Sequence, residues 1–233
     1  MTQPPELTVL TLTLNEGKAL GRFLRRLTML ESRVGSYELL VIDGGSTDRS
    51  VEIAREGGAR VVMQAKPGYA SAYLQGLSEA RGRYILCVDA DSSHPLEIVS
   101  EFWRRREEFS AVCGSRYLPG GGDARPWLRR LMSRLLNSSY AAFLSVPLTD
   151  ISGGFRLYRA EAVRDMRCRA RHYDVVAEIL VRLHSGGHRI LEIPYRYVPR
   201  QEGASKARLL YFSYCYIKTM LELWWWLRFG RKA

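Results

Sequence analysis

The stretch Tyr84-Ile85-Leu86-Cys87-Val88-Asp89-Ala90-Asp91 places two carboxylates directly after a short apolar run. Such a run is typical of a strand in a parallel sheet that is covered on both faces. In open α/β sheets, ligands bind in the crevice at the carboxyl ends of the strands. Mg²⁺ and Mn²⁺ prefer oxygen ligands and often join one or two carboxylates to substrate phosphates. The pattern therefore predicts a metal–diphosphate site at Asp89 and Asp91, although aspartates after a strand also serve as turn residues or helix caps.

The first half of the chain alternates between strand and helix patterns. Strands are predicted at 7–14, 37–42, 60–63, 84–88 and 111–114, and helices at 17–30, 46–56, 69–80 and 95–106. Pro95 favours the start of the last of these helices because proline fits a first helical turn. Repeated βα units of this length predict an α/β fold with a Rossmann-like, doubly wound and mostly parallel sheet.

The second half is less regular. We expect a glycine-rich mobile loop at 118–125, a helix at 127–144, a glycine-containing turn at 150–156, a helix at 174–184, a strand at 189–198 and a polar loop at 203–206. The sequence shows no internal repeat and no linker. We therefore predict one domain over 1–207, followed by an aromatic-rich tail at 208–233.

The charge of the chain indicates a phosphate-bearing partner. The 233 residues include 35 lysines and arginines against 24 aspartates and glutamates, a formal net charge of +11. Such an excess favours nucleotides, phospholipid surfaces or nucleic acid. The four cysteines form no C-x-x-C pair and the four histidines show no zinc spacing, which predicts reduced thiols and no zinc site. The N-terminus shows no secretory signal, so we expect the protein in the cytosol.

Polar side chains follow several of the predicted strands. Asn15-Glu16, Asp43 and Asp89-x-Asp91 all come just after a strand end. Because successive parallel strands end at the same edge of a sheet, we expect these groups to lie together. A carboxylate such as Asp43 can accept a hydrogen bond from a nucleobase N–H or a ribose hydroxyl. The arrangement predicts a nucleotide site, whereas each residue alone is also explained by an ordinary strand–turn–helix junction.

The order of these motifs resembles the family-2 glycosyltransferases, in particular the branch of dolichyl-phosphate (polyprenyl-phosphate) mannosyltransferases. The resemblance runs from Leu7 to about Lys206 and depends on several short motifs in order. They are Leu12-Thr13-Leu14-Asn15-Glu16, Val41-Ile42-Asp43-Gly44-Gly45-Ser46-Thr47-Asp48, Asp89-Ala90-Asp91-Ser92-Ser93-His94-Pro95, Gly114-Ser115-Arg116-Tyr117, Asp150-Ile151-Ser152-Gly153-Gly154-Phe155-Arg156 and Arg200-Gln201-Glu202-Gly203-Ala204-Ser205-Lys206.

This resemblance implies a GT-A fold, a GDP- or UDP-sugar donor and a lipid acceptor, a polyprenyl phosphate. It implies Mg²⁺ or Mn²⁺ at Asp89 and Asp91, assisted by Ser93. The residues expected to bind the donor are Glu16, Ile42, Asp43, Asp89, Ala90, Asp91 and Arg116. Those expected to bind the acceptor are Arg130, Ser133, Glu178, Arg200, Ser205 and Lys206. Asp150 and Arg156 are expected to brace the intervening loop.

Two departures from the family pattern affect the base pocket. Leu12 and Leu14 stand where relatives carry proline and tyrosine, and Asp43-Gly44 stands where this branch usually carries two aspartates. The choice between guanine and uracil therefore stays open. The sequence contains no Q-x-x-R-W motif, which argues against a processive polysaccharide synthase.

The expected chemistry is inverting transfer of a single sugar of the mannose or glucose type. A phosphate oxygen is already anionic near neutral pH, so it needs no general base, whereas a hydroxyl acceptor does. Two phosphates brought close together need cations to offset their repulsion. The candidate cations are Arg116, Arg129, Arg130, Arg200 and Lys206. The resemblance implies Asp89, Asp91, Arg116, Arg200 and Lys206 as the catalytic set.

Two other functions are compatible with parts of the sequence. A related transferase could act on a hydroxyl of a glycan or small metabolite, with Asp174 or Glu178 as its base. A nucleic-acid-binding module fits the charge, but the sequence contains no aromatic-interleaved basic stripe that would support it.

The tail reads as a membrane-associating helix. Its segment 209–227 is apolar and rich in Trp and Tyr, with basic residues on both sides. Lys218 and Glu222 lie near its centre, where each charge would cost roughly 2.5–3.5 kcal/mol in a bilayer. We expect an amphipathic helix at the membrane interface, and a peripheral protein at the cytoplasmic face. Packing on a membrane-embedded partner or a second subunit, and spanning the bilayer, are the alternatives. Deletion of 209–233 is expected to leave the domain folded and to release it from membranes.

Overall fold

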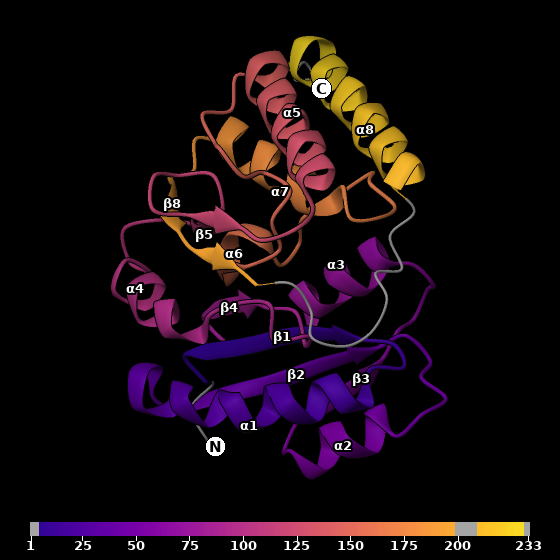
Figure 1. Ribbon diagram of the computed structural model, residues 1–233, viewed down its shortest axis with the longest axis vertical. Helices are drawn as coiled ribbons and strands as arrows, with labels where there is room; N and C mark the ends of the chain where they lie inside the picture. The colour runs from indigo at the N-terminus through magenta and orange to yellow at the C-terminus, as the bar shows by residue number, and fades with distance from the viewer. Residues whose placement is uncertain (1–4, 199–208, 231–233) are drawn as a thin grey trace.

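In a computed structural model, which describes residues 5–198 and 209–230, a seven-stranded sheet forms the centre of the molecule (Figure 1). The strand order is β3-β2-β1-β4-β7-β5-β8. The strands are β1 (Leu7–Thr13), β2 (Tyr37–Asp43), β3 (Arg60–Met63), β4 (Tyr84–Cys87), β5 (Ala111–Ser115), β7 (Arg156–Arg159) and β8 (Ile190–Pro194). All neighbours pair in parallel except β7, which runs antiparallel between β4 and β5. The predicted mostly parallel α/β sheet is confirmed.

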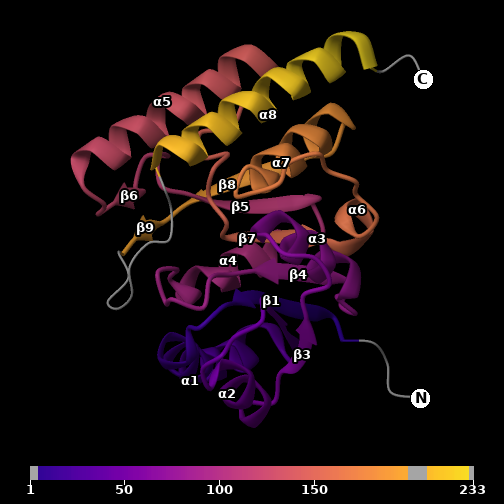
Figure 2. The same ribbon diagram turned by 90° about the vertical axis from the view of Figure 1, so that its right-hand side faces the viewer.

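Helices cover both faces of this sheet because its strands alternate their side chains between two cores. Leu39 and Val41 of β2 join one apolar cluster, whereas Leu40 and Ile42 join the other. On the first face lie α1 (Gly17–Val34), α2 (Ser50–Glu56), the 3₁₀ turn η1 (Leu96–Ile98) and α4 (Val99–Arg104). On the second lie α3 (Tyr69–Glu79), α5 (Trp127–Leu144), α6 (Ala160–Val163), α7 (Val175–Ser185) and α8 (Leu209–Phe229). Figure 2 shows the resulting layers, and the fold is doubly wound, as predicted.

The largest differences from the sequence prediction lie in the second half. The region predicted as a glycine-containing turn at 150–156 leads into β7, which the sequence did not indicate. The predicted strand 189–198 is two strands, β8 in the main sheet and β9 (Arg196–Tyr197) in a separate two-stranded ladder with β6 (Gly122–Asp123). Residues 122–123 of the expected mobile loop therefore form a strand that pairs with β9.

Helix α8 is part of the domain and not a separate tail. Cys215, Tyr216, Thr219, Met220 and Leu223 form its buried face against α5 and α7. Three hydrogen bonds join it to the body: Tyr140 Oη donates to the Tyr216 carbonyl (2.7 Å), Tyr216 Oη to the Tyr173 carbonyl (2.9 Å), and Thr219 Oγ1 to Asp174 (2.6 Å). The structure is at odds with the expectation that the domain stays folded without 209–233, because deletion would uncover the apolar side chains against which α8 packs.

The alternative of a membrane-spanning tail also fails. No helix within residues 5–198 and 209–230 is both long enough and apolar enough to cross a bilayer.

Candidate active site

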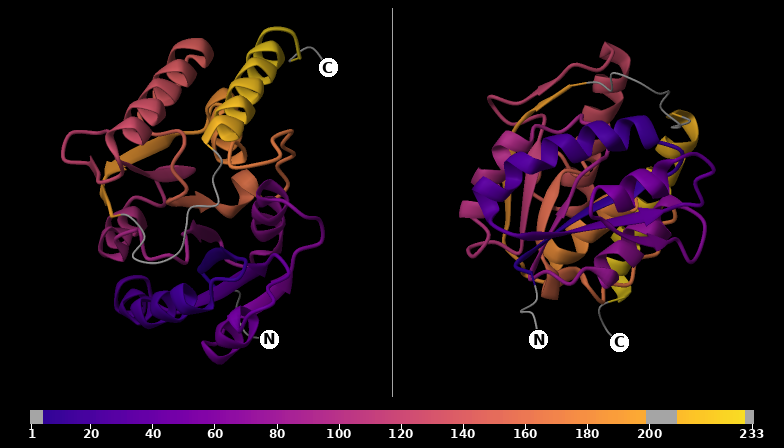
Figure 3. Two further views of the ribbon diagram at one scale, coloured as in Figure 1. Left: turned by 45° about the vertical axis from the view of Figure 1, so that its right-hand side comes forward. Right: turned by 90° about the horizontal axis from the view of Figure 1, so that it is seen from below.

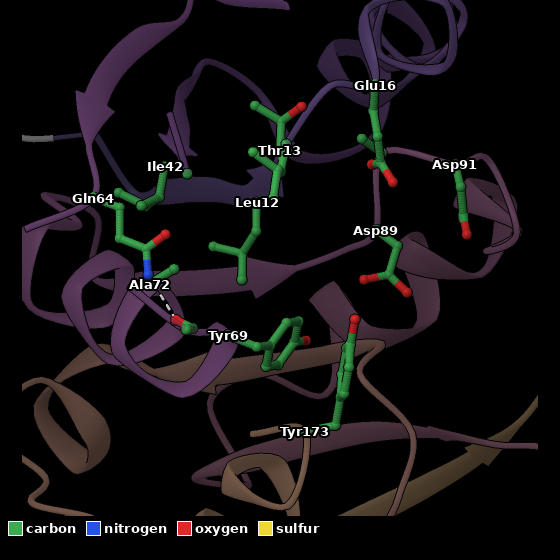
Figure 4. Close-up of a pocket in the computed structure, with 14 residues that line it drawn as sticks. Leu12, Thr13, Glu16, Ile42, Gln64, Tyr69, Ala72, Asp89, Asp91 and Tyr173 are labelled. Carbon is green, nitrogen blue, oxygen red and sulfur yellow. Dashed lines mark hydrogen bonds between the residues drawn. The ribbon is translucent and has the colours of Figure 1, made fainter. Parts of the chain in front are cut away.

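A cavity of about 230 Å³ opens at the carboxyl ends of β1, β2 and β4 (Figure 4). Its wall combines apolar side chains from β1 and β2, the loop after β3, the start of α3 and the residues after β4. Asp89, Asp91 and Glu16 lie at one end, and Gln64 and Ile42 at the other. The lining residues are Leu12, Thr13, Leu14, Glu16, Ile42, Gly44, Gln64, Gly68, Tyr69, Ala72, Asp89, Ala90, Asp91 and Tyr173.

The two predicted metal ligands differ in exposure. The Asp89 side chain is 44% exposed, whereas Asp91 is 8% exposed. The Asp91 carboxylate accepts a hydrogen bond from the Ser93 backbone N–H (2.9 Å), and Ser92 between them has φ of 61°. The loop after β4 therefore turns so that both carboxylates reach the same end of the cavity.

The residues at this end fit a hard divalent cation. Carboxylate oxygens are the ligands that Mg²⁺ and Mn²⁺ accept. The Ser93 hydroxyl, beside Asp91, is buried with no hydrogen-bond partner among the described residues. Those residues contain no ready-made cluster of three or more acidic, His or Cys side chains around one point. A cation held by one or two carboxylates would complete its shell with substrate phosphates and water.

The loop that carries Glu16 is held by the loop after β2. The Asn15 N–H donates to Ser46 Oγ (2.9 Å), and Asn15 Oδ1 accepts from the Thr47 N–H (2.7 Å). The Glu16 N–H donates to Ser50 Oγ (3.0 Å). Asn15 therefore positions Glu16 at the cavity instead of lining it.

Asp48 completes this junction between the two loops. Its carboxylate accepts hydrogen bonds from the Ser50 hydroxyl (2.5 Å) and from the Gly17 N–H (3.1 Å). These bonds, chiefly the one from Ser50, hold the pKa of Asp48 below its usual value. Asp48 thus stays ionised and ties the start of α1 to the start of α2.

Asp43 lies beneath the wall, and Ile42 and Gly44 on either side of it line the cavity. The Asp43 carboxylate is fully buried. It accepts hydrogen bonds from the N–H groups of Gly45 (2.9 Å) and Ser46 (2.8 Å) and from the Ser46 hydroxyl (2.6 Å). The structure thus shows Asp43 shaping the turn after β2, and the contact with a base predicted for it stays a prediction.

The sequence reading missed Gln64. Gln64 Nε2 donates to the carbonyls of Lys66 (2.5 Å) and Gly68 (2.7 Å), which fixes the orientation of the amide. Its Oε1 lies 3.2 Å from where a Cβ on Gly44 would be. The missing side chain at Gly44, noted as a departure from the family, makes room for this oxygen.

Two tyrosines that line the cavity were also missed. The rings of Tyr69 and Tyr173 pack at 4.1 Å between centroids and lie along one side of the cavity (Figure 4). Neither belongs to a motif, so no sequence signal would have placed them here.

Arg116 lies outside the cavity wall. It donates to both carboxylate oxygens of Asp150 (2.7 Å each) and to Ser152 Oγ (3.0 Å). Burial alone would lower the pKa of Arg116, but the Asp150 carboxylate outweighs this and raises it well above its usual value. The bracing role predicted for Asp150 fits this pair. For Arg116, contact with a diphosphate stays a prediction, because its side chain is already held by Asp150.

Glu178 cannot bind an acceptor as predicted. Its carboxylate is 1% exposed and accepts from the N–H groups of Arg169 (2.9 Å) and Ala170 (2.7 Å). Arg182 pairs with it at 2.6 Å. Asp174 is buried as well and bonds the His172 N–H and Thr219. Both carboxylates that were considered as bases are therefore structural.

The other predicted acceptor residues fall in two groups. Ser133 Oγ on α5 lies 3.4 Å from Ser152 Oγ, beside the Arg116–Asp150 pair, and Arg130 is exposed one turn earlier. Arg200, Ser205 and Lys206 lie outside the described residues.

Comparisons with known proteins agree with this architecture. Residues 8–167 match the family model described as glycosyl transferase family 2. Uncharacterised glycosyltransferases of Mycobacterium tuberculosis and Mycobacterium bovis are 29% identical over 199 residues, which is 85% of this chain and 88% of each relative.

Solved structures of similar fold include glucosyl-3-phosphoglycerate synthase from M. tuberculosis. Its complex with Mn²⁺, UDP and glucosyl-3-phosphoglycerate has a TM-score of 0.76 at 20% identity and covers 95% of this chain and 80% of that one. A complex with Mn²⁺, UDP and phosphoglyceric acid has a TM-score of 0.76 at 21% identity, covering 95% and 79%. At this identity the likeness concerns the fold, and it confirms the predicted GT-A architecture.

Proposed function

Since this chain belongs to glycosyl transferase family 2, we propose that it moves one sugar from a nucleotide-diphosphate sugar to an acceptor, with Mg²⁺ or Mn²⁺ at Asp89 and Asp91. The observation that carries the proposal is a cavity with an acidic end at Asp89 and Asp91 and an opposite end where apolar wall surrounds the Gln64 amide. Such a cavity suits a donor that has charged phosphates at one end and a nearly flat base at the other. A UDP-sugar is the first donor to test, because the solved proteins of this fold bind UDP with Mn²⁺.

Different residues of the cavity would bind the cation and the rest of the donor. The cation, when bound, neutralises the diphosphate and stabilises it as a leaving group. Asp89, Asp91 and Ser93 are the groups that would hold it. Ile42 and Ala90 form apolar wall, and Glu16 faces the acidic end. Arg116 lies outside the wall and is paired with Asp150.

We propose a polyprenyl phosphate as acceptor, on the ground that the two candidate bases are unavailable. Glu178 and Asp174 are buried and fully engaged, so neither can take a proton from a hydroxyl. A phosphate oxygen attacks the anomeric carbon without such help. The new C–O bond forms as the bond to the nucleoside diphosphate breaks on the opposite side, which inverts the configuration. Such a lipid acceptor would place the protein at the cytoplasmic face of the membrane.

A hydroxyl of a small phosphorylated metabolite is the second candidate acceptor, and the comparisons favour this class over a lipid phosphate. The solved neighbours are glucosyl-3-phosphoglycerate synthases, some of them with phosphoglyceric acid bound. Both candidates carry a phosphate, so both suit the positive charge of the chain.

The test offers UDP-glucose, UDP-N-acetylglucosamine and GDP-mannose in turn, with Mn²⁺, to the full chain. Each donor is paired with a short polyprenyl phosphate or with 3-phosphoglycerate, and products are identified by mass spectrometry. We expect a metal-dependent prenyl-phosphate sugar whose anomeric configuration, measured by NMR, is opposite to that of the donor. A sugar found on phosphoglycerate instead would overturn the lipid acceptor, and no transfer with any pair would overturn the proposed function.

A further inference from the structure

The large apolar side chains that are exposed gather on two neighbouring helices. Of the fifteen among the described residues, five belong to α5 and six to α8. Figures 1 and 2 show these helices side by side, and Figure 3 shows them at the end of the molecule opposite α1 and α2. We call these side chains the α5–α8 face: Trp127, Leu128, Leu131, Leu135, Phe143, Tyr211, Tyr214, Ile217, Leu221, Trp225 and Phe229.

Helix α8 is apolar on two opposite sides. Tyr214, Ile217, Leu221 and Trp225 recur every three or four residues, which forms one stripe along the helix. Its buried residues, such as Tyr216 and Leu223, lie about half a turn away and pack into the domain. A helix that is apolar all round is normally buried all round. The outward stripe therefore needs a covering that the described chain does not provide, and a contiguous apolar patch of this kind marks an interaction site.

The charged residues of α5 and α8 indicate what kind of surface covers the stripe. Helix α5 contains Arg129, Arg130 and Arg134, all exposed, and no acidic residue. On α8, Lys218 is paired with Glu222 at 3.8 Å, and Arg228 is exposed near its end. The two helices thus carry a net positive charge, which an anionic surface would complement. A second copy of this chain would bring the same positive face opposite itself and be repelled.

We propose that the α5–α8 face docks on an anionic lipid surface, with both helices lying in the headgroup region. Exposed Trp and Tyr beside Arg are the side chains that favour this depth. The proposal extends the sequence prediction, which assigned membrane contact to 208–233 alone, by making α5 an equal part. Docking itself does not depend on the proposed function. Its benefit rests on that function, since docking would bring a lipid phosphate near Ser133, on the same helix as Arg130.

The test is flotation of the full chain with vesicles of phosphatidylcholine, with and without phosphatidylglycerol, and with no donor or acceptor present. Leu135→Glu on α5 and Leu221→Glu on α8 place a negative charge at positions that are 60% and 55% exposed. The matched control is Met29→Glu, at a 37% exposed position on α1 at the far end. We expect binding to anionic vesicles only, reduced about tenfold or more by either face variant and unchanged by the control. Thermal unfolding of each variant checks that its fold is intact.

Two results would overturn the proposal. One is no binding to anionic vesicles, or binding that neither face variant weakens. The other is light scattering that shows a dimer which both face variants dissociate, because a second copy would then cover the face. Vesicle binding without transfer to any acceptor would reject the proposed function and leave this inference intact.

Discussion

His94 is joined to Asp89 at two points. The Asp89 backbone N–H donates to His94 Nδ1 (3.3 Å), and Nε2 of the same ring lies 3.9 Å from Asp89 Oδ2. A neutral ring that accepts at Nδ1 carries its proton on Nε2, on the side of the carboxylate. The ring is buried and stacks on Phe155 at 4.7 Å between centroids. His94 therefore holds the backbone of a proposed metal ligand by a hydrogen bond and lies close to its carboxylate.

Replacing His94 by Phe should weaken cation binding more than it weakens the fold. Phe keeps the stack on Phe155 but removes both nitrogens, so Asp89 loses its support. Loss of a partner that orients a metal ligand typically lowers metal affinity about 10- to 100-fold. Mn²⁺ binding in the presence of UDP, followed by electron paramagnetic resonance, measures this loss. His188→Phe is the control, because His188 is exposed and bonds Ser110 far from the cavity. Equal Mn²⁺ affinity in the wild type and His94→Phe would reject the positioning role.

Asp89→Asn should lower the transfer rate by about 100-fold or more while leaving the unfolding temperature unchanged. The amide keeps the size of the side chain but removes the charge that would hold the cation. Initial rates at saturating Mn²⁺, together with rates after chelation by EDTA, measure the effect. Asp165→Asn, at an exposed position outside the cavity, should behave as the wild type. A variant at Asp89 with near-normal turnover would contradict the metal site.

Glu178→Gln should destabilise the protein without changing the KM for the acceptor. The change leaves Arg182 facing a neutral group in a largely buried site, and removing one member of a buried ion pair costs about 3 kcal/mol or more. Urea unfolding gives the free energy. Glu161→Gln is the control, since Glu161 is 75% exposed and its pair with Arg159 is loose at 3.5 Å. If the variant were as stable as the wild type and had a raised KM for the acceptor, Glu178 would bind the acceptor after all.

Gln64→Ala should lower affinity for UDP by about tenfold, a loss equal to one good hydrogen bond. With Nε2 held by two carbonyls, Oε1 is the atom that can accept a base N–H. UDP methylated at N3 lacks that N–H, so the variant should bind it no worse than the wild type does. Calorimetric titration with UDP and with N3-methylated UDP distinguishes loss of this hydrogen bond from damage to the loop, because a damaged loop would weaken the binding of both nucleotides. Gln75→Ala is the control, because Gln75 supports the same loop through Met63 and Ala65 outside the cavity.

The first five strands could be read from the sequence because local pattern decides them. Residues 60–63 and 127–144 match the predicted bounds of β3 and α5, since an apolar run and a 3.6-residue period need no distant partner. β7 could not be read in this way. Its Arg156 is buried, which depends on its donors meeting the carbonyls of Ile151 and Val176.

In the site, too, local patterns could be read from the sequence whereas contacts with distant segments could not. Asp89 and Asp91 could be placed at the cavity from the sequence because a strand followed by Asp-x-Asp is one short motif. The roles of Glu178 and Asp174 were wrong because their partners come from other segments, at 169–170 and at Thr219. A carboxylate's type predicts what it can do, but only its neighbours in space decide whether it is free to do it.

The antiparallel strand β7 sets the order in which a growing chain can complete its site. β4, which leads into Asp89, pairs with β1, which precedes it in the chain, but its partner at the other edge, β7, is synthesised about 70 residues later. At ~5–20 residues per second that interval is roughly 3–14 s. During it, the strand that carries the cation ligands exposes unpaired backbone groups. The nascent chain is therefore open to misassembly at one edge of β4, the strand that leads into the proposed cation ligands.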